Sequence, residues 1–222
     1  MRASVASLCL AMALSSPAAA AEKAGGLRGT QVSLTAQAER PTAYMRVYAM
    51  VRAPMGFVQF CEVFPKDCEP GQAEETRVVL TADLWSELDR TNRTVNREVQ
   101  PVSDLDNYGV EEWWSLPLNG KGDCEDYALM KRHLLMERGW PPSALLMTVV
   151  RDEKGDGHAI LTARTAQGDF ILDNKTSEIK LWHATTYKYV MRQSFINPRA
   201  WMSLDPKEAV TPPNISGNRT QP

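Results

Sequence analysis

The sequence predicts an α+β fold in which helices pack on an antiparallel sheet. Two patterns follow one another along the chain. Apolar residues recur every three to four positions in the first part, whereas short apolar runs separated by turn residues fill the second part. The first pattern is typical of amphipathic helices and the second of strands joined by hairpins. Helices and antiparallel strands that are segregated along a chain form the two layers of an α+β domain.

The amino end has the pattern of a secretory signal peptide over residues 1–21. Arg2 precedes an uncharged stretch, residues 3–16, and Pro17 is followed by four alanines. This apolar run is about half as long as the roughly 20 apolar residues that a membrane-spanning helix needs. We therefore expect the leader to be removed, together with Cys9, and the mature chain to be periplasmic or secreted.

The rest of the chain is expected to contain one domain, residues 51–202, between a lead-in segment, 22–50, and a disordered tail, 203–222. Roughly 200 residues are enough for one substantial hydrophobic core. The 25 basic and 27 acidic residues give a net charge of -2 and are interspersed, so nothing favours a nucleic-acid partner. No later stretch is apolar enough to cross a bilayer, and we expect the mature protein not to be embedded in a membrane.

A first helix is predicted to begin at Thr81, and Pro101 ends it. Its apolar stripe recurs at helical spacing and consists of Leu84, Leu88, Thr91, Val95 and Val99. The next segment, residues 104–119, is rich in Asp, Asn, Gly, Trp and Pro. We expect a loop there that Trp113 and Trp114 pack onto the domain.

A second helix is predicted with Cys124 in its first turn. Asp123 suits the N-cap position, and Asp126 follows three residues later as the partner of a capping box. Gly139 suits the position just after the helix, and prolines at 141–142 prevent its continuation.

Strands are predicted after this helix, because the period of the apolar residues changes. Turn residues fill 153–157 and 165–169, between short apolar runs. The predicted strands are 145–150, 158–163 and 170–172, with a further strand at 179–182.

The cysteines that remain after export are Cys61, Cys68 and Cys124, in an oxidising environment where thiols pair. Cys61 and Cys68 flank a short loop that a local bridge can close, which contributes about 2 to 3 kcal/mol. Cys124 is then left over. A leftover thiol forms an intermolecular bridge, is buried and inert, or is reactive, and its neighbours decide which.

Cys124 lies where a helix favours the thiolate, the form in which a cysteine acts as a nucleophile. Three nearby acids, Asp123, Glu125 and Asp126, act in the opposite direction and raise the pKa of the thiol. A protonated histidine or a bound cation would neutralise them.

His158 is the predicted base among three histidines, because it opens a strand after a Gly-rich turn. His133 lies nine residues along the helix of Cys124, about 180° round and about 13 Å away, and cannot reach the thiol. His183 is the alternative base. Without an acid near it in the fold, we would interpret His158 as a hydrogen-bonded structural histidine.

Asp173 ends the next predicted strand and lies roughly opposite His158. Cross-strand neighbours approach within about 5 Å, close enough for a carboxylate to fix the tautomer of an imidazole. This would complete a set of nucleophile, base and orienting acid. The alternative, which the sequence supports equally well, is that Asp173 forms a turn together with Asn174.

At these residues the sequence resembles the bacterial transglutaminase-like cysteine proteinases of the LapG type. The resemblance extends over about residues 54–201. It rests on Gly-Asp-Cys-Glu-Asp-Tyr-Ala-Leu-Met-Lys at 122–131, Gly-His-Ala-Ile-Leu at 157–161, Leu-Asp-Asn at 172–174, Tyr-Gly at 108–109 and Glu-Trp-Trp-Ser-Leu-Pro at 112–117.

The resemblance implies a transglutaminase-like, papain-related fold and hydrolysis of peptide bonds in a bacterial periplasm. It implies a triad of Cys124, His158 and Asp173, with Asp123 and Glu125 taking part in calcium binding. It also implies a large surface adhesin as the protein substrate and a membrane-bound cyclic-dinucleotide receptor as a regulator. The short connection from cysteine to histidine and the Cys61–Cys68 bridge depart from the best-known members.

Three alternatives stay open on the sequence. The acceptor of the acyl group is water in a protease and an amine in a transglutaminase. A non-catalytic calcium-binding module would need neither the thiol nor His158. For the metal itself, Asp123 and Glu125 fall short of the about six to eight oxygens that calcium takes, and solvated acids at a capped helix end are the other reading.

Overall fold

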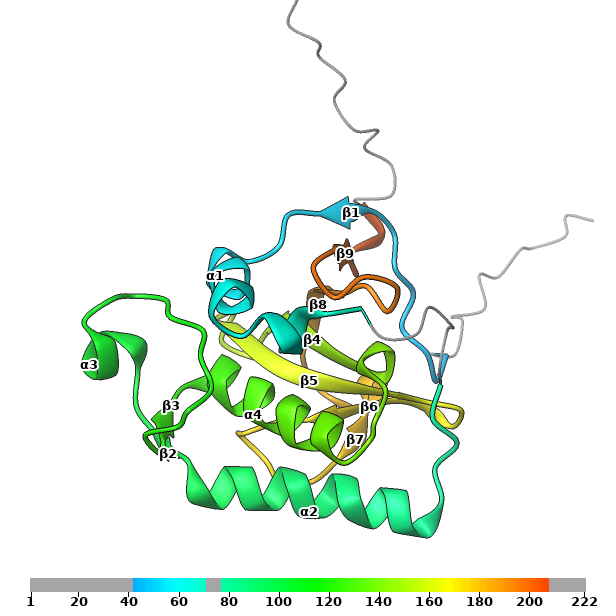
Figure 1. Cartoon of the computed structure of the whole chain (residues 1–222). Coiled ribbons are helices and arrows are strands. Elements are labelled where there is room, and N and C mark those ends of the chain that lie inside the picture. The colour runs from blue at the N-terminus through cyan, green and yellow to red at the C-terminus, as the bar shows by residue number, and fades with distance from the viewer. Residues whose placement is uncertain (1–41, 71–76, 208–222) are drawn as a thin grey trace, which may run out of the picture. The chain divides into compact units, whose positions relative to one another are not determined.

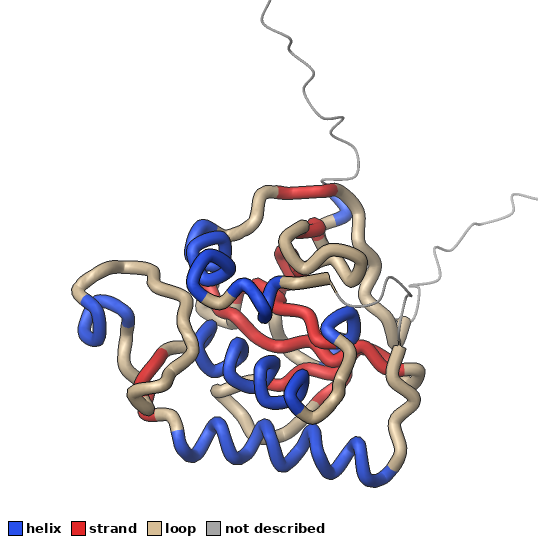
Figure 2. Tube along the Cα trace, in the orientation of Figure 1, coloured by secondary structure: helices blue, strands red, loops and turns tan. Residues whose placement is uncertain are grey.

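The computed structural model describes residues 42–70 and 77–207. The predicted leader, residues 1–21, most of the lead-in segment and residues 208–222 of the predicted tail lie outside the described residues. The described chain forms a seven-stranded sheet with the long helices on one face (Figure 1; Figure 2). The α+β prediction is confirmed.

The long helices agree with the prediction. Helix α2 spans Ala82–Glu98, and Thr81 caps it, because the Thr81 hydroxyl accepts the Leu84 N–H at 3.2 Å. Helix α4 spans Cys124–Glu137 and is followed by Gly139 with a φ of 92°. α4 packs on the sheet, and α2 packs on α4. Two shorter helices were not predicted, α1 at Met55–Val63 and α3 at Asp104–Tyr108.

The sheet is antiparallel throughout, and its strand order is β1-β9-β8-β4-β5-β6-β7. The predicted hairpin strands form its centre as β4 (Leu145–Arg151), β5 (Gly157–Thr165) and β6 (Gly168–Leu172), followed by β7 (Lys180–Leu181). Within this sheet, the strands that the sequence did not predict are β1 (Met50–Val51), β8 (Lys188–Gln193) and β9 (Trp201–Ser203). A small parallel pair joins β2 (Gln100–Pro101) to β3 (Lys121–Gly122).

The segment 104–119 is not wholly a loop, which corrects the prediction. Its first residues form α3 because the Ser103 hydroxyl accepts the Asp106 N–H at 3.2 Å, and Gly109 ends the helix at a φ of 75°. Trp114 packs as expected and is 6% exposed, whereas Trp113 is 39% exposed and does not.

The main core lies between α4, α1 and the sheet. Trp114 meets Trp201 of β9 and Phe57 of α1 edge to face, with ring centroids 6.3 Å and 5.9 Å apart. Gly56 is required there, since a Cβ at that position would lie 2.3 Å from the Trp114 ring. The unpredicted α1 thus positions the tryptophan that borders the site described below.

The predicted disulfide between Cys61 and Cys68 is present, with Cα atoms 5.6 Å apart, and Cys124 is a free thiol. The bridge joins the end of α1 to the 3-10 turn Pro65–Cys68.

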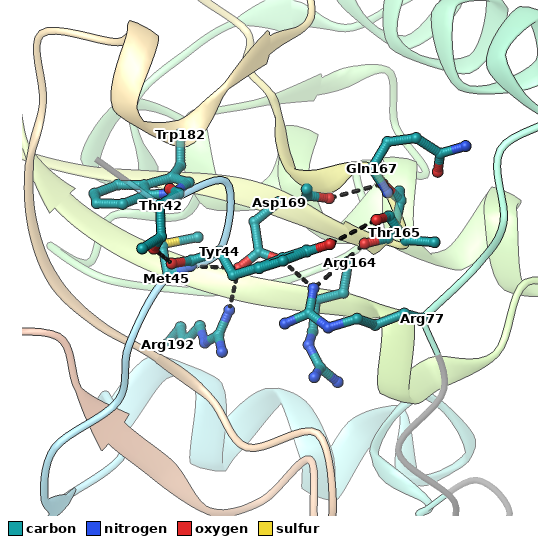
Figure 3. A network of polar contacts seen from close by, with 12 residues as sticks. Thr42, Tyr44, Met45, Arg77, Arg164, Thr165, Gln167, Asp169, Trp182 and Arg192 are labelled. Atoms are coloured by element: carbon teal, nitrogen blue, oxygen red, sulfur yellow. Dashed lines mark hydrogen bonds and ion pairs between the residues drawn. The ribbon is translucent and has the colours of Figure 1, made fainter. Parts of the chain in front are cut away.

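Asp169 of β6 fastens the described part of the lead-in segment to the sheet (Figure 3). Its buried carboxylate accepts the Met45 N–H at 2.9 Å, Arg77 at 2.8 Å and Arg192 of β8 at 3.1 Å. Nearby, the Tyr44 hydroxyl donates to the Ala166 carbonyl at 2.6 Å. We name these contacts the Asp169 tie.

The carboxyl end of the described chain also belongs to the domain. Ser203 completes β9, and Leu204 is 9% exposed in the core, so the first two residues of the segment expected to be a tail belong to the domain. Over 42–70 and 77–207, no helix has the length and apolar character that a bilayer span requires.

Candidate active site

The amino end of α4 places Cys124 as the first helical residue, and Asp123 occupies the N-cap position as predicted. The predicted capping box does not form. The Asp123 carboxylate instead accepts the Asp104 N–H at 3.3 Å, and the Asp126 carboxylate accepts the Ser115 N–H at 2.8 Å. These backbone donors compete successfully for the two acids, which thereby hold the 104–115 segment against the start of α4.

The thiol of Cys124 lies between a carboxylate and a backbone donor. Its Sγ is 3.0 Å from Glu125 Oε2 and accepts the Ala159 N–H at 3.4 Å. Burial raises the pKa of Cys124, and the charge and hydrogen bond of Glu125 raise it further. Burial and the neighbouring Asp123 in turn raise the pKa of Glu125 to about 9. The opposition of the acids to thiolate formation, inferred from the sequence, is therefore present in the structure.

His158 and Asp173 form a buried hydrogen-bonded pair. The ring Nε2 of His158 lies 2.9 Å from Asp173 Oδ1, and the two residues are 4% and 2% exposed. β5 begins one residue before His158, and Asp173 directly follows β6, which pairs with β5. The two residues lie at the ends of neighbouring strands, but the register pairs Leu161 with Leu172, so Asp173 is not directly opposite His158 as predicted and reaches it diagonally.

Asp173 combines the two roles that the sequence left open. Its Oδ1 also accepts the Lys175 N–H at 3.0 Å, which is the turn that was foreseen, and its Oδ2 accepts the hydroxyl of Tyr187. Burial alone would raise the pKa of this carboxyl, but the hydrogen bonds from His158, Tyr187 and Lys175 outweigh burial and hold it below its usual value. Asp173 is therefore an ionised acceptor facing the imidazole.

Cys124 and His158 line one cavity of about 200 Å³, without a direct hydrogen bond between their side chains. Its wall comes from six parts of the chain, namely Pro54, Glu112 and Trp114, Cys124 and Glu125, Val149, Gly157 to Ala159, and Met191. The other two histidines lie elsewhere. His133 bonds Asp67 at 3.0 Å, as expected for a packing histidine, and His183 is exposed in the turn after β7.

Two residues that contact Asp173 were not identified from the sequence. Tyr187 lies just before β8, a strand whose apolar pattern is weak, and only the alternation from Tyr187 to Met191 could have indicated it. Asn96 of α2 donates to the Asp173 carbonyl at 2.9 Å. Asn96 lies next to the apolar stripe of α2, four residues after the buried Asn92, and this spacing could have indicated that its side chain faces the domain.

Three carboxylates gather where α3, β3 and α4 meet. Ligand atoms of Asp104, Asp123 and Asp126 lie within 4.8 Å of one another, and each residue keeps one buried oxygen without a hydrogen-bond partner. Burial raises the pKa of Asp104 to about 6 and that of Asp126 to about 8. Gly122 keeps the cluster open, since a Cβ there would lie 2.5 Å from Asp126 Oδ2.

This cluster fits a hard cation such as calcium, which binds carboxylate oxygens. Asp123 was expected as a ligand and belongs to it. Glu125 belongs instead to a second group with Asp123 and Cys124, where it accepts the thiol. Asp104 and Asp126 were not foreseen as ligands, because nothing in the sequence brings residue 104 next to the start of α4.

Comparison with known proteins gives one family. A family model described as bacterial transglutaminase-like cysteine proteinase BTLCP matches residues 47–209. Among solved structures, calcium-bound LapG from Legionella pneumophila is 21% identical, with 62% of this chain and 73% of that chain covered and a TM-score of 0.45. EGTA-treated LapG from the same organism is 22% identical, with 62% and 71% covered and a TM-score of 0.44. No curated protein matches the chain.

Proposed function

Because the chain belongs to the bacterial transglutaminase-like cysteine proteinases, we propose that its cysteine-peptidase activity resides in a triad of Cys124, His158 and Asp173. One observation carries this assignment. The buried His158–Asp173 hydrogen bond of 2.9 Å lies beside the cavity that also holds the free thiol. A nucleophile, a base and an acid that orients the base are the parts that covalent acyl transfer requires.

The proposed reaction begins when the Cys124 thiolate attacks a peptide carbonyl. Because Asp173 holds Nε2 of His158, the other ring nitrogen, Nδ1, is the one available to exchange a proton with the thiol. His158 then protonates the leaving amine, and water, deprotonated by the same ring, attacks the thioester and releases the new carboxyl end. The N–H groups at the start of α4 favour the negative charge that develops there.

Calcium is proposed as a bound ion held by Asp123 with Asp104 and Asp126. The three unpartnered buried oxygens support this site, and they replace the pair Asp123 and Glu125 as the best ligand set. A divalent ion would supply positive charge beside the thiol and offset the effect of the surrounding acids on its pKa.

The site of action is proposed to be the periplasm or the cell exterior. The leader pattern of residues 1–21 supports export, and the Cys61–Cys68 bridge supports an oxidising compartment. The proposed substrate is a large protein of the cell surface, an adhesin in the resembled family, and the proposed regulator is a membrane-bound receptor.

The test is to incubate the mature protein with the surface proteome of its own cells and to map new amino termini by mass spectrometry. Cys124→Ala is the matched control, because it removes only the thiol sulfur from the site. Cleavage at discrete bonds by the wild type alone is the expected result. Incorporation of a labelled amine without new termini would identify a transglutaminase instead, and no thiol-dependent reaction would contradict the triad.

A further inference from the structure

A second cavity, of about 290 Å³, adjoins the catalytic cavity, and Met191 lines both. The remaining wall of this second cavity is formed by Val51, Arg52, Arg151, Lys188, Tyr189, Val190, Ser203 and Asp205. Three of these residues are cations and one is an acid. We name this cavity the basic cavity.

The register of β4 places one cation of the basic cavity, Arg151, on the face of the sheet that borders the thiol. Val149 of β4 lines the catalytic cavity, and Arg151 follows two residues later, so both side chains point to one face. Two residues of a strand span about 7 Å. Arg52 of the basic cavity likewise lies two residues from Pro54 of the catalytic cavity, in the segment between β1 and α1. A peptide bound in extended form across the thiol would therefore reach the basic cavity within about two residues.

The cations of the basic cavity are incompletely neutralised by the described protein. Arg151 and Lys188 are directly opposite each other on β4 and β8, an arrangement of like charges that is destabilising. Arg151 donates to the Gly155 carbonyl at 3.0 Å. Within 42–70 and 77–207, neither Lys188 nor Arg52 has an ion-pair partner, and both are exposed. Asp205 is the one carboxylate in the wall.

The wall of the neighbouring catalytic cavity differs in charge, because it contains the acid Glu112 and no lysine or arginine. An acidic side chain is thus repelled at the thiol and attracted next to it. This arrangement of charge would favour peptides whose acidic side chain falls in the basic cavity. Peptides whose acidic side chain falls beside the thiol would be disfavoured by repulsion between like charges.

We propose that the basic cavity is a subsite that binds an aspartate or glutamate of the substrate, about two residues from the bond that Cys124 cleaves. The carboxylate would lie between Arg151 and Lys188 and relieve their repulsion, with Arg52 as a third cation. This inference rests on the proposed peptidase function and adds the chemical class of one substrate side chain to it.

The first experiment profiles cleavage of a proteome-derived peptide library by mass spectrometry. The wild type is expected to show enrichment of acidic residues two or three positions from the cut. The enrichment should disappear with the double variant Arg151→Gln, Lys188→Gln. It should remain with the control Arg90→Gln, which removes an exposed cation on α2. Equal enrichment in the double variant, or none in the wild type, overturns the proposal.

The second experiment measures kcat and KM for a peptide pair that differs only by Glu or Gln at the enriched position. We expect about fivefold higher kcat/KM for the Glu peptide, expressed mainly in KM, and no difference in the double variant. Lys188→Glu leaves two cations and two acids in the wall, so it should abolish the preference for the Glu peptide while the Gln peptide is still cleaved at the wild-type rate, which separates recognition from any loss of folding. If the wild type cleaves both peptides equally and Cys124→Ala cleaves neither, this inference falls and the peptidase assignment stands. If no peptide is cleaved in a Cys124-dependent manner, both fall.

Discussion

At the scale of single residues, the triad assignment makes separate predictions for its three members. Cys124→Ala and His158→Ala should each abolish turnover without unfolding the domain, because no other side chain of the cavity replaces a nucleophile or a base. Asp173→Asn should retain a rate reduced by about 10² to 10⁴, since the acid orients the ring rather than reacting. Steady-state kinetics with circular dichroism as the folding check measure all three. His183→Ala is the control, and a dead His183→Ala with an active His158→Ala would reassign the base.

Tyr187 provides a finer test of the same pair. Its hydroxyl donates to Asp173 Oδ2, so Tyr187→Phe should loosen the carboxylate and lower kcat by about threefold to tenfold while KM changes little. Tyr44→Phe is the matched control, because it also removes one hydroxyl hydrogen bond, to Ala166, but at the Asp169 tie. An equal loss of kcat in both variants would mean that general destabilisation, not the orientation of Asp173, is responsible.

The residues that could be predicted from the sequence are those with local signals. Cys124 follows an N-cap residue and His158 follows a Gly-rich turn, so the chemistry of each position is written in its neighbours. Tyr187, Asn96 and Asp104 could not be found this way, because their contacts join segments far apart in the chain. Asp123 and Asp126 were wrongly predicted to form a capping box because the backbone donors that bind them, at Asp104 of α3 and at Ser115, have no local signal in the sequence.

At the scale of elements, the buried ammonium of Lys131 in α4 lowers the free energy of unfolding. This residue is fully buried, and within the described part of the chain its ammonium has no hydrogen-bond partner. Burial lowers its pKa to about 7, although the charge of Asp173 acts in the opposite direction. The unfolded chain therefore binds this proton up to a higher pH than the folded one, and stability should rise as the pH increases from 7 towards 10.

Lys131→Met should remove that dependence. We expect the variant to melt about 5 °C higher than the wild type at pH 7 and the difference to shrink as the pH rises, because the wild type gains stability and the variant does not. Calorimetry at several pH values measures this, with exposed Lys66→Met as the control. A lower melting temperature for Lys131→Met at pH 7 would show that the ammonium is stabilised by groups that the geometry does not reveal.

The junction of α3 and α4 predicts how calcium acts. Calcium should raise the melting temperature of the wild type, and more so at pH 8.5 than at pH 5.5. The reason is that Asp104 and Asp126, with pKa values near 6 and 8, must lose their protons to bind the ion. Asp104→Asn should remove the effect, whereas Asp106→Asn, an exposed neighbour in α3, should not.

A comparison with Glu125→Gln decides between the two groups of acids. If Glu125→Gln abolishes the calcium effect and Asp104→Asn does not, the ion binds to Asp123 and Glu125 as the resemblance implied. Identical melting of the wild type in calcium and in a chelator would remove the metal from the account altogether.

Elements with a strong period were predictable, and short ones were not. The stripe of α2 and the hairpins of β4 to β6 extend over enough residues to define their periods. β1 and β9 have two and three residues, too few for any pattern. They form because β9 pairs with β8 and β1 then pairs with β9 as the edge strand. Helix α1 lacks a side-chain cap and is fixed by burial of its aromatic residues and by the disulfide.

At the scale of the whole molecule, the disulfide predicts a simple pattern of reactivity. Only Cys124 should be alkylated by iodoacetamide in the native, unreduced mature protein, because Cys61 and Cys68 are joined and nearly inaccessible, at 2% and 1% exposed. Peptide mapping after alkylation checks this. Modification of Cys61 or Cys68 without reductant would contradict the bridge.

The Asp169 tie predicts that stability depends on residues outside the main core. Asp169→Asn should lower the free energy of unfolding by about 3 kcal/mol, because one buried carboxylate holds residue 45, residue 77 and β8 together. Chemical denaturation gives the difference, and exposed Asp156→Asn is the control. An unchanged midpoint for Asp169→Asn would mean that the neighbouring hydrogen bonds suffice.

The two cations Arg151 and Lys188, opposite each other on β4 and β8, also link the thermal stability of the protein to its substrate preference. A laboratory selection for heat resistance would favour any variant in which one of these two opposed cations is lost, since removing the repulsion raises stability. Such variants would emerge early and would lose their preference for acidic substrates while still cleaving others. Thermal screening should therefore be combined with a second screen for cleavage of an acidic peptide. Without it, the most heat-resistant variants will also be those with the weakest preference for acidic substrates.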